Sequence, residues 1–229
     1  MNILEVKNLN YSYPDGDGKR VIFNNCNVSF SLGKFYSILG DSGSGKTTFL
    51  SIIAGLDKKY QGEVLYEGKE IKEIGLDKYR RSGVSMIFQS YNLIPHLNAI
   101  ENCFIAMDIS SNVNRLDKNK VRKLLELYGI DEKKAKRKVN SLSGGEQQRV
   151  AIVRTILSES KIIVADEPTG NLDQNVSQSI INEFIRLAHE DNKCVIMVTH
   201  NQKLANQSDV VFKLNTDTQN FECCTNSML

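Results

Sequence analysis

Short apolar runs that favour β-strands alternate with stretches of helical periodicity along most of this chain. The strand-like runs are residues 3–6, 21–30, 35–39, 63–66, 84–88, 161–165 and 194–199. An apolar run over residues 49–53 predicts a helix that ends at Gly55, and the amphipathic segment 176–188 predicts another helix. Alternation of this kind is typical of a mostly parallel sheet covered by helices.

Two segments depart from this alternation. Turn-forming residues fill positions 14–18, so we expect the first two strands to form an antiparallel hairpin, with Val28 and Phe30 on one face. From residue 98 to about residue 140 the pattern is helical and polar, and Gly129 suits the end of a helix. The apolar positions at helical spacing there are Val121, Leu124, Leu125 and Tyr128. We therefore expect a helical subdomain inserted between two halves of an α/β core.

The composition is that of an ordinary globular domain. The 229 residues are 41% hydrophobic and 24% charged, which fits one domain with subdomains and excludes a disordered or collagen-like chain. Lys and Arg number 29 against 27 Asp and Glu, a net charge of +2, so the charge gives no reason to expect a nucleic acid as partner. The basic run 133–138 is short, and we expect it to be a solvated helix end.

The cysteines and the apolar runs indicate the cellular compartment of the chain. Five cysteines lie scattered without a CxxC pair, which is typical of reduced thiols in the cytosol. The first ten residues lack the apolar core of a signal peptide, and no apolar run approaches the roughly 20 residues of a transmembrane helix. We expect a soluble cytoplasmic protein that reaches a membrane only through a partner.

A glycine-rich segment between a predicted strand and a predicted helix carries the first candidate chemistry. Residues 40–47 read GDSGSGKT and match the pattern GxxxxGK followed by Ser or Thr. Glycines let backbone N–H groups converge on phosphate oxygens, and the following helix directs its positive end at the same charge. Lys46 would neutralise β- and γ-phosphate oxygens, and the Thr47 hydroxyl would bind Mg²⁺. The alternative is a glycine-rich turn with an exposed lysine. The candidate nucleotide-binding residues of this segment are Gly40, Asp41, Ser42, Gly43, Ser44, Gly45, Lys46, Thr47 and Thr48.

Two carboxylates follow the apolar strand at residues 161–165. Beside a phosphate loop, Asp166 is suited to the magnesium shell, and Glu167 is suited to polarise a water in line with the γ-phosphate. Two acids at the end of a buried strand are otherwise a costly arrangement. The alternative is an ordinary strand exit.

Residues 142–149, LSGGEQQR, stand directly ahead of an apolar helix. They resemble the LSGGQ signature of the ATP-binding-cassette (ABC) ATPases, and the phosphate loop, this segment and the acid pair follow in that family's order over nearly the whole chain. The resemblance implies that Ser143, Gly144 and Gly145 begin a helix that receives the γ-phosphate of a nucleotide on the opposite subunit. Glu146 stands where glutamine is commonest, and the direction of its carboxylate is left open. The alternative is a plain Ser-Gly-Gly helix cap.

The resemblance also implies a fold and an assembly. The fold class is α/β: a P-loop NTPase core with a mixed, mostly parallel sheet, an N-terminal antiparallel β subdomain and an inserted α-helical subdomain. We expect one domain over 1–229, in which 1–90 and 158–229 form the core with the β subdomain and about 91–157 form the helical subdomain. Each chain then holds two half-sites and completes them by dimerising on ATP, with a second copy or with another ABC subunit.

Further site residues are implied position by position. Gln89 matches the glutamine that reaches the magnesium and the attacking water, and His200 matches the histidine that contacts the γ-phosphate and the catalytic glutamate. The resemblance thus gives catalytic roles to Lys46, Gln89, Glu167 and His200, and magnesium contacts to Thr47, Gln89 and Asp166. Asp173 matches an aspartate that links the two sites.

Tyr13 matches the aromatic residue that stacks on adenine, a contact that aromatic faces make well. Tyr11 lies on the same strand face and is the competing assignment. His96 and His189 receive no role. The pair Cys223 and Cys224 ends a C-terminal segment that departs from the family's usual pattern, and we assign it no function.

The motifs as a set resemble the branch of the family that contains macrolide exporters, lipoprotein-release ATPases and FtsE-like proteins. The implied function is an ATPase that uses ATP and Mg²⁺ to drive an integral membrane permease, from the inner face of the cell membrane and without nucleic acid. Residues 91–97 and the helical insert would face the permease. Export is the favoured role, and an FtsE-like mechanotransmission role is the alternative. A soluble ABC protein acting on nucleic acid and a P-loop metabolite kinase are more remote alternatives.

Overall fold

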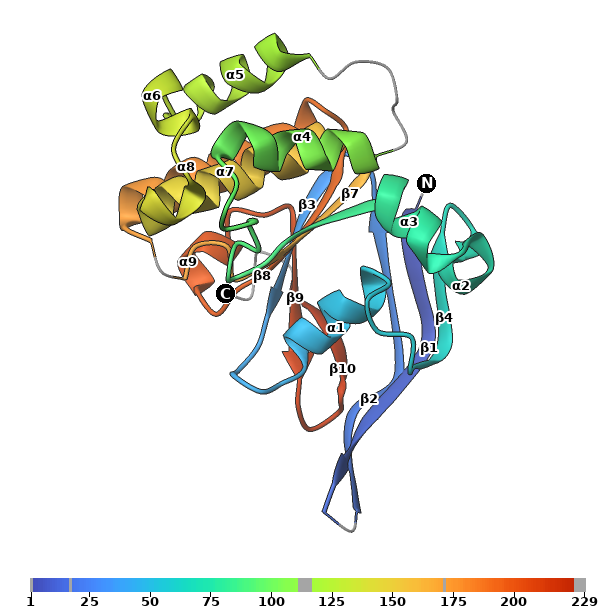
Figure 1. Ribbon diagram of the computed structural model, residues 1–229. Helices are drawn as coiled ribbons and strands as arrows, with labels where there is room; N and C mark the ends of the chain where they lie inside the picture. The colour runs from blue at the N-terminus through green and yellow to red at the C-terminus, as the bar shows by residue number, and fades with distance from the viewer. Residues whose placement is uncertain (1, 17, 111–116, 171, 225–229) are drawn as a thin grey trace.

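The computed structural model describes residues 2–16, 18–110, 117–170 and 172–224. In this part of the chain two sheets and the helices around them form the molecule (Figure 1). The strands are β1 (Asn2–Asp15), β2 (Gly18–Ser31), β3 (Lys34–Leu39), β4 (Gln61–Tyr66), β5 (Lys69–Glu70), β6 (Val84–Ile87), β7 (Ile162–Asp166), β8 (Cys194–Val198), β9 (Val210–Asn215) and β10 (Asn220–Cys224). The helices are α1 (Lys46–Ile53), α2 (Ile71–Ile74), α3 (Leu76–Ser82), α4 (Ala99–Ile109), α5 (Lys118–Leu127), α6 (Glu132–Ala135), α7 (Gly144–Leu157), α8 (Gln174–His189) and α9 (Gln202–Ala205).

The larger sheet has the order β10-β9-β3-β8-β7-β6 and is parallel except for its edge strand β10. Every residue of β7 and β8 is buried, which explains why these strands read as continuous apolar runs rather than alternating ones. Ile38 of β3 and Asp166 of β7 both pair with Val198 of β8. The carboxyl ends of these three strands therefore meet at one edge of the sheet, where parallel sheets place their sites.

The smaller sheet is antiparallel with the order β2-β1-β4-β5. Strands β1 and β2 form the predicted hairpin, which closes between Asp15 and Gly18 and projects beyond the rest of the sheet (Figure 1). Tyr13 and Arg20 face each other across it. This sheet is the antiparallel β subdomain that the resemblance implied.

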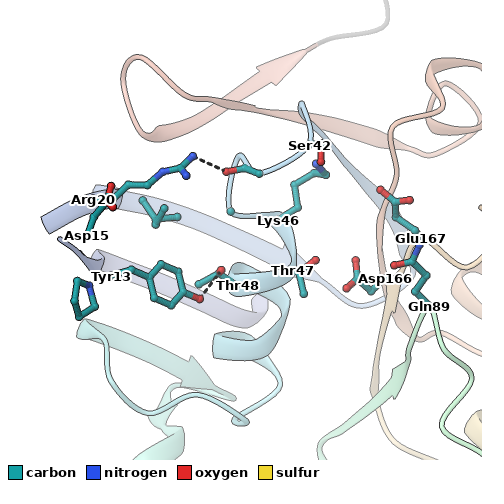
Figure 2. Close-up of a pocket in the computed structure, with 14 residues that line it drawn as sticks. Tyr13, Asp15, Arg20, Ser42, Lys46, Thr47, Thr48, Gln89, Asp166 and Glu167 are labelled. Atoms are coloured by element: carbon teal, nitrogen blue, oxygen red, sulfur yellow. Dashed lines mark hydrogen bonds between the residues drawn. The ribbon is translucent and has the colours of Figure 1, made fainter.

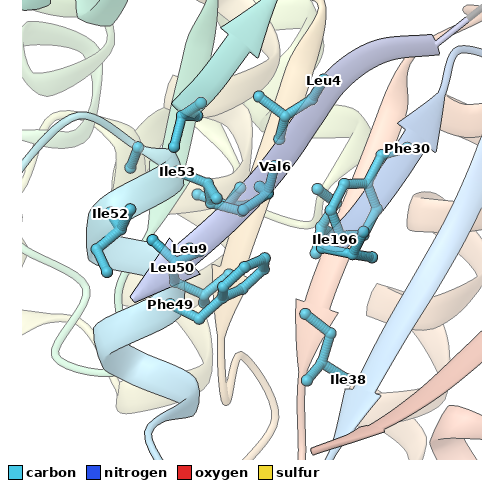
Figure 3. Packing of buried hydrophobic residues seen from close by; sticks show 14 of the residues in the cluster. Leu4, Val6, Leu9, Phe30, Ile38, Phe49, Leu50, Ile52, Ile53 and Ile196 are labelled. Carbon is cyan, nitrogen blue, oxygen red and sulfur yellow. The ribbon is translucent and has the colours of Figure 1, made fainter. Parts of the chain in front are cut away.

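Helix α1 joins the two sheets through a shared core. Its residues Phe49, Leu50 and Ile53 are fully buried among side chains of both sheets. Figure 3 shows them beside Leu9 of β1, with Ile196 of β8 nearby. Replacing the buried Leu50 by alanine would cost about 2–5 kcal/mol of stability, because the core would lose apolar contacts and keep a cavity. Helix α1 and the loop ahead of it are therefore firmly anchored.

Helices α4 to α7 have a hydrophobic cluster of their own. Val121 and Leu125 of α5 are fully buried in it, and Leu124 packs partly buried beside them, as the helical spacing predicted. Helix α5 ends before Gly129, whose φ of +73° suits a glycine at a helix end. Helix α7 contributes to this cluster and also, through Ile152, to the cluster beneath α8, so it connects the helical region to the parallel sheet.

The structure adds elements that the sequence analysis did not predict, namely β5, α2, α3, α9 and the hairpin of β9 and β10. The turn of that hairpin lacks glycine. Instead the Asn215 side chain accepts hydrogen bonds from the backbone N–H groups of Asp217 and Thr218, and Gln219 takes a φ of +54°. Among the described helices, none has both the length and the apolar character needed to span a bilayer.

Candidate functional site

A cavity of about 590 Å³ lies where the hairpin, the glycine-rich loop and the ends of β6 and β7 meet (Figure 2). Tyr13 and Arg20 lie at one end of this cavity, Asp166 and Glu167 at the other, and Lys46 between them (Figure 2). Its lining residues are Tyr13, Pro14, Asp15, Arg20, Ile22, Ser42, Gly43, Gly45, Lys46, Thr47, Thr48, Gln89, Asp166 and Glu167. The predicted phosphate loop, acid pair, Gln89 and Tyr13 are therefore brought together in one cavity.

The loop between β3 and α1 requires glycine at Gly45. Its φ is +104°, and a Cβ there would lie 2.3 Å from Cγ2 of Ile22. This close approach seats the start of α1 against the hairpin. The N-terminus of α1 consequently opens into the cavity, and its backbone N–H groups can bind an anion there.

Lys46 is buried, with 6% of its surface exposed. Its Nζ donates hydrogen bonds to the carbonyl oxygens of Gly40 at 2.9 Å and Asp41 at 2.6 Å, so the loop closes around the side chain. Burial lowers the pKa of Lys46, while the nearby carboxylates, chiefly Glu167 and Asp166, act in the opposite direction. The result is a cation held between the loop and the acid pair.

Asp166 lies at the end of β7 and is also buried. Burial raises its pKa, the charge of Glu167 adds to this, and a hydrogen bond from Thr47 and the charge of Lys46 oppose it. The Thr47 hydroxyl, the Asp166 carboxylate and the Gln89 amide are oxygen donors on one cavity, the ligand type that Mg²⁺ prefers. These residues fit the magnesium ion that the sequence implied.

Glu167 follows Asp166 in a backbone conformation that is unusual for a residue other than glycine. Its φ is +44°, and its N–H donates to the carbonyl of Val198 at 3.0 Å. The carboxylate Oε2 lies 3.1 Å from Nδ1 of His200, which follows β8 and is exposed. The register of β7 and β8 thus brings the predicted glutamate and histidine into contact.

Tyr11 and Tyr13 of β1 differ in their exposure and in their hydrogen-bond partners. Tyr13 is 43% exposed, lines the cavity and shares a 3.0 Å hydrogen bond between its hydroxyl and Oγ1 of Thr48. Tyr11 is buried and donates its hydroxyl to Asp57 at 2.6 Å, outside the cavity lining. The rings meet edge to face, with centroids 5.0 Å apart. The geometry favours Tyr13 as the residue that faces a base.

The sequence analysis missed Arg20. It reaches the cavity from β2 and donates from Nη2 to the carbonyl oxygen of Gly43 at 3.2 Å. The signal that could have found it is the hairpin register, because Arg20 lies directly opposite Tyr13. Together these two side chains tie the hairpin to the loop and to α1.

The candidate signature lies elsewhere on the chain. Ser143 caps α7: its Oγ accepts from the N–H of Glu146, and the Glu146 carboxylate accepts from the N–H of Ser143. The open question about Glu146 is therefore answered, since its carboxylate turns back onto the start of its own helix. Neither residue is among those that line the phosphate cavity, nor are Gly144 and Gly145.

Asp173 also lies outside that cavity and caps α8, where its side chain accepts from the N–H of Val176 at 3.0 Å. His189 binds the Asp209 carboxylate with Nε2 at 3.0 Å, and that carboxylate also accepts from the N–H of Phe35. His189 thus ties the end of α8 to the sheet. His96 is exposed.

A glycine loop between a strand and a helix, a lysine enclosed by that loop, and two carboxylates at the end of β7 in the same sheet define a phosphate-loop nucleoside triphosphatase. A family model described as ABC transporter matches residues 23–170. The chain belongs to the ABC transporter family and is an ATP-binding ATPase of that family.

Sequence similarity to several ABC proteins extends over most of the chain. An uncharacterised ABC transporter ATP-binding protein of Bacillus subtilis, YclH, is 44% identical over 93% of this chain and 94% of its own. The lipoprotein-releasing system ATP-binding protein LolD of Rickettsia bellii is 37% identical over 93% and 95%. The macrolide export ATP-binding/permease protein MacB of Mannheimia succiniciproducens is 36% identical over 93% of this chain and 33% of its own.

Solved structures agree with the fold. The dimeric structure of MJ0796, a bacterial ABC transporter cassette, superimposes with a TM-score of 0.87 at 34% identity over 96% of each chain. A dimeric post-hydrolysis state of MJ0796 bound to ADP and Pi superimposes equally well. The predicted α/β class with its antiparallel subdomain is confirmed.

Proposed function

We propose that this chain is the ATPase subunit of an export complex, and that two copies enclose two ATP molecules head to tail and drive a membrane permease. The observation that carries the proposal is the separation of the two predicted half-sites. The phosphate cavity holds Lys46 and the acid pair, whereas the signature at Ser143 lies outside it. A second chain can supply the missing half.

Within one half-site, adenine stacks on Tyr13 and the triphosphate extends along the loop towards Glu167. Lys46 exchanges loop carbonyls for phosphate oxygens, a gain because phosphate is charged and carbonyl is not. Thr47, Gln89 and Asp166 hold magnesium. The ion, when bound, neutralises charge on the β- and γ-phosphate oxygens.

Glu167 accepts a hydrogen bond from the attacking water and His200 keeps the carboxylate aimed. The 3.1 Å contact between them and the burial of the adjacent Asp166 support these roles. There is little covalent chemistry for the protein to perform, so positioning and electrostatic stabilisation supply the rate enhancement.

The partner's signature completes the site. The N-terminus of α7 offers backbone N–H groups and a positive dipole end to the γ-phosphate, and the Ser143 hydroxyl donates to it. Asp173, at the start of α8, connects the two sites across the interface. Names of relatives and the dimeric MJ0796 cassette support this assembly.

A second cavity, of about 360 Å³, supports a permease partner. It lies between the helical region and the core, and its lining includes Leu56 and Ile109, which are 49% and 55% exposed. Its lining includes Asn92 and Ile94, which follow Gln89 in the chain. A permease segment in this groove would touch the loop that carries Gln89 and would hold the ATPase at the membrane surface.

The names of two relatives favour export, since one is a lipoprotein-releasing system protein and one a macrolide exporter. The rival is an FtsE-like role, in which the permease transmits force to an extracellular partner. Co-purification of the native membrane partner distinguishes them, because an exporter's permease and a mechanotransmission permease with a large extracellular domain differ in sequence.

Mixing two defective chains tests the shared site. In a Glu167→Gln background, a Ser143→Arg chain and a Lys46→Ala chain should each fail to dimerise on ATP, and their mixture should form ATP-dependent heterodimers with one intact site. Tagged chains and a pull-down with and without ATP provide the measurement. Dimerisation of the Ser143→Arg chain alone at the level of its parent contradicts the shared site.

A further inference from the structure

Both oxygens of the Glu146 carboxylate are engaged within the chain. Oε2 accepts a hydrogen bond from the N–H of Ser143 at 2.8 Å, and Oε1 lies 3.1 Å from Nζ of Lys134 in α6. Glu146 is thus held in a capping box and an ion pair at the same time. Glutamine, the commoner residue at this position of the signature, would carry no charge there.

That charge matters because the start of α7 is the proposed receptor for a phosphate. A carboxylate there stabilises its own helix but repels a second anion. The hydrogen bond from Ser143 is the chief cause that lowers the pKa of Glu146, and Lys134 adds to it, so the carboxylate is ionised at neutral pH. Unless it is neutralised, Glu146 weakens phosphate binding by the helix.

The backbone at Lys134 is fixed by two contacts, which places the side chain near Glu146. Asp131 caps the N-terminus of α6, where its side chain accepts from the N–H of Lys134 at 2.9 Å, and Ala135, which follows Lys134, is buried in the cluster of the helical region. The side chains of Lys134 and Glu146 are 38% and 17% exposed, so the pair is less screened than a surface pair. The predicted solvated run 133–138 therefore contains a lysine, Lys134, that pairs with the signature, and its Nζ also lies 3.9 Å from Oδ2 of Asp131.

The other cations of that run differ from Lys134. Lys133, Lys136, Arg137 and Lys138 are exposed, and Lys136 pairs with Glu132 within its own turn. Lys136 therefore provides a matched control: it has the same charge and lies two residues from Lys134, and its ion pair does not involve the signature.

We propose that Lys134 is a positioning residue for ATP binding: it turns the Glu146 carboxylate back and neutralises it, so that the signature can receive the partner's γ-phosphate. The inference rests on the proposed function of the signature. Ser143 Oγ accepts from the N–H of Glu146, which leaves the hydroxyl proton for the phosphate. The lysine acts through Glu146 and has no contact with nucleotide.

A double-mutant cycle tests this inference. In the non-hydrolysing Glu167→Gln background, the ATP concentration for half-maximal dimerisation is measured by gel filtration for Lys134→Met with and without Glu146→Gln. Lys134→Met should raise that concentration about tenfold when Glu146 is present, because two like charges then meet at the interface. When Glu146→Gln is also present, the same lysine change should have an effect of less than about twofold. Lys136→Met should have no effect.

Three outcomes decide the matter. The inference is overturned if Lys134→Met leaves the ATP concentration for half-maximal dimerisation unchanged while Glu146 is present. It is also overturned if Lys134→Met raises that concentration equally with and without Glu146→Gln, because Lys134 would then act by packing alone. Thermal unfolding of each monomer reports any folding defect, and Lys134→Gln replaces the methionine variant if it unfolds early. If Ser143→Arg leaves dimerisation intact, the proposed function of the signature fails instead, and the two failures are thereby distinguished.

Discussion

Nδ1 of His200 lies 3.1 Å from Oε2 of Glu167, and this contact joins the ends of two adjacent parallel strands. The glutamate is held from a second direction, because its N–H is bound to the carbonyl of Val198 at the end of the histidine's strand. Its left-handed backbone is a strain that the surrounding structure maintains. The carboxylate thus has a fixed direction at the acid end of the phosphate cavity.

Removing the charge of Glu167 tests its role. Glu167→Gln should keep ATP binding and lower turnover at least about a hundredfold, the usual loss when a group that accepts a proton or orients water is removed. The variant should accumulate as an ATP-bound dimer, seen by gel filtration with ATP and Mg²⁺. Glu63→Gln, on the exposed part of β4, is the control. Turnover at the wild-type rate would remove Glu167 from catalysis.

Variants of Tyr11 and Tyr13 should have separate effects on ATP binding and on the stability of the fold. Tyr13→Ala should raise the KM for ATP about tenfold, since stacking of a base on an aromatic ring contributes about 1–3 kcal/mol. Tyr11→Phe removes the hydroxyl that donates to Asp57, and should lower the free energy of unfolding by about 1–3 kcal/mol with little change in KM. Steady-state kinetics and denaturant unfolding measure both. The reverse pattern would assign the adenine contact to Tyr11.

Arg154 fixes the loop that follows Gln89. Its Nη1 and Nη2 donate to the carbonyls of Asn92 at 2.5 Å and Tyr91 at 2.9 Å, and both of these residues have positive φ. Arg154→Met should destabilise the fold by about 1.5–3 kcal/mol, because the carbonyls of Tyr91 and Asn92 lose hydrogen bonds from a charged donor. Amide hydrogen exchange over residues 89–94 should accelerate more than elsewhere. Arg122→Met, on the exposed face of α5, is the control, and unchanged exchange in the Arg154 variant would contradict the role.

Thiol reactivity should follow burial. Burial raises the pKa of Cys26 to about 11 and that of Cys103 to about 12, whereas Cys223 is exposed. Because the thiolate is the reactive form, near pH 8 Cys26 and Cys103 should resist alkylation until the protein unfolds, and Cys223 should react at once. Mass spectrometry after timed alkylation gives the order. Equal rates for Cys103 and Cys223 would contradict the described burial.

The sequence was sufficient for features encoded locally. The phosphate loop, the strand before the acid pair and the apolar face of α5 follow from spacing over a few residues, because burial on one or both faces fixes the pattern. The hairpin followed from its turn residues. The short elements between β4 and β6 did not, since their apolar positions are too few to establish a period.

Features that depend on distant partners were out of reach. The exact hairpin register, which places Arg20 opposite Tyr13, does not follow from the turn residues alone, and the ion-pair partner of Glu146, Lys134, belongs to another helix. The strand β10 was missed because an asparagine side chain and a left-handed glutamine replace the expected glycine turn. In each case tertiary context decides what the local pattern leaves open.

The dependence of ATPase activity on protein concentration tests the composite site most directly. The rate per chain should be measured at saturating ATP and Mg²⁺ over a dilution series, with the fraction of dimer in each sample determined by sedimentation. We predict that the rate per chain falls in proportion to the dimer and vanishes where the protein is monomeric. A rate per chain that stays constant into the monomeric range would contradict the account.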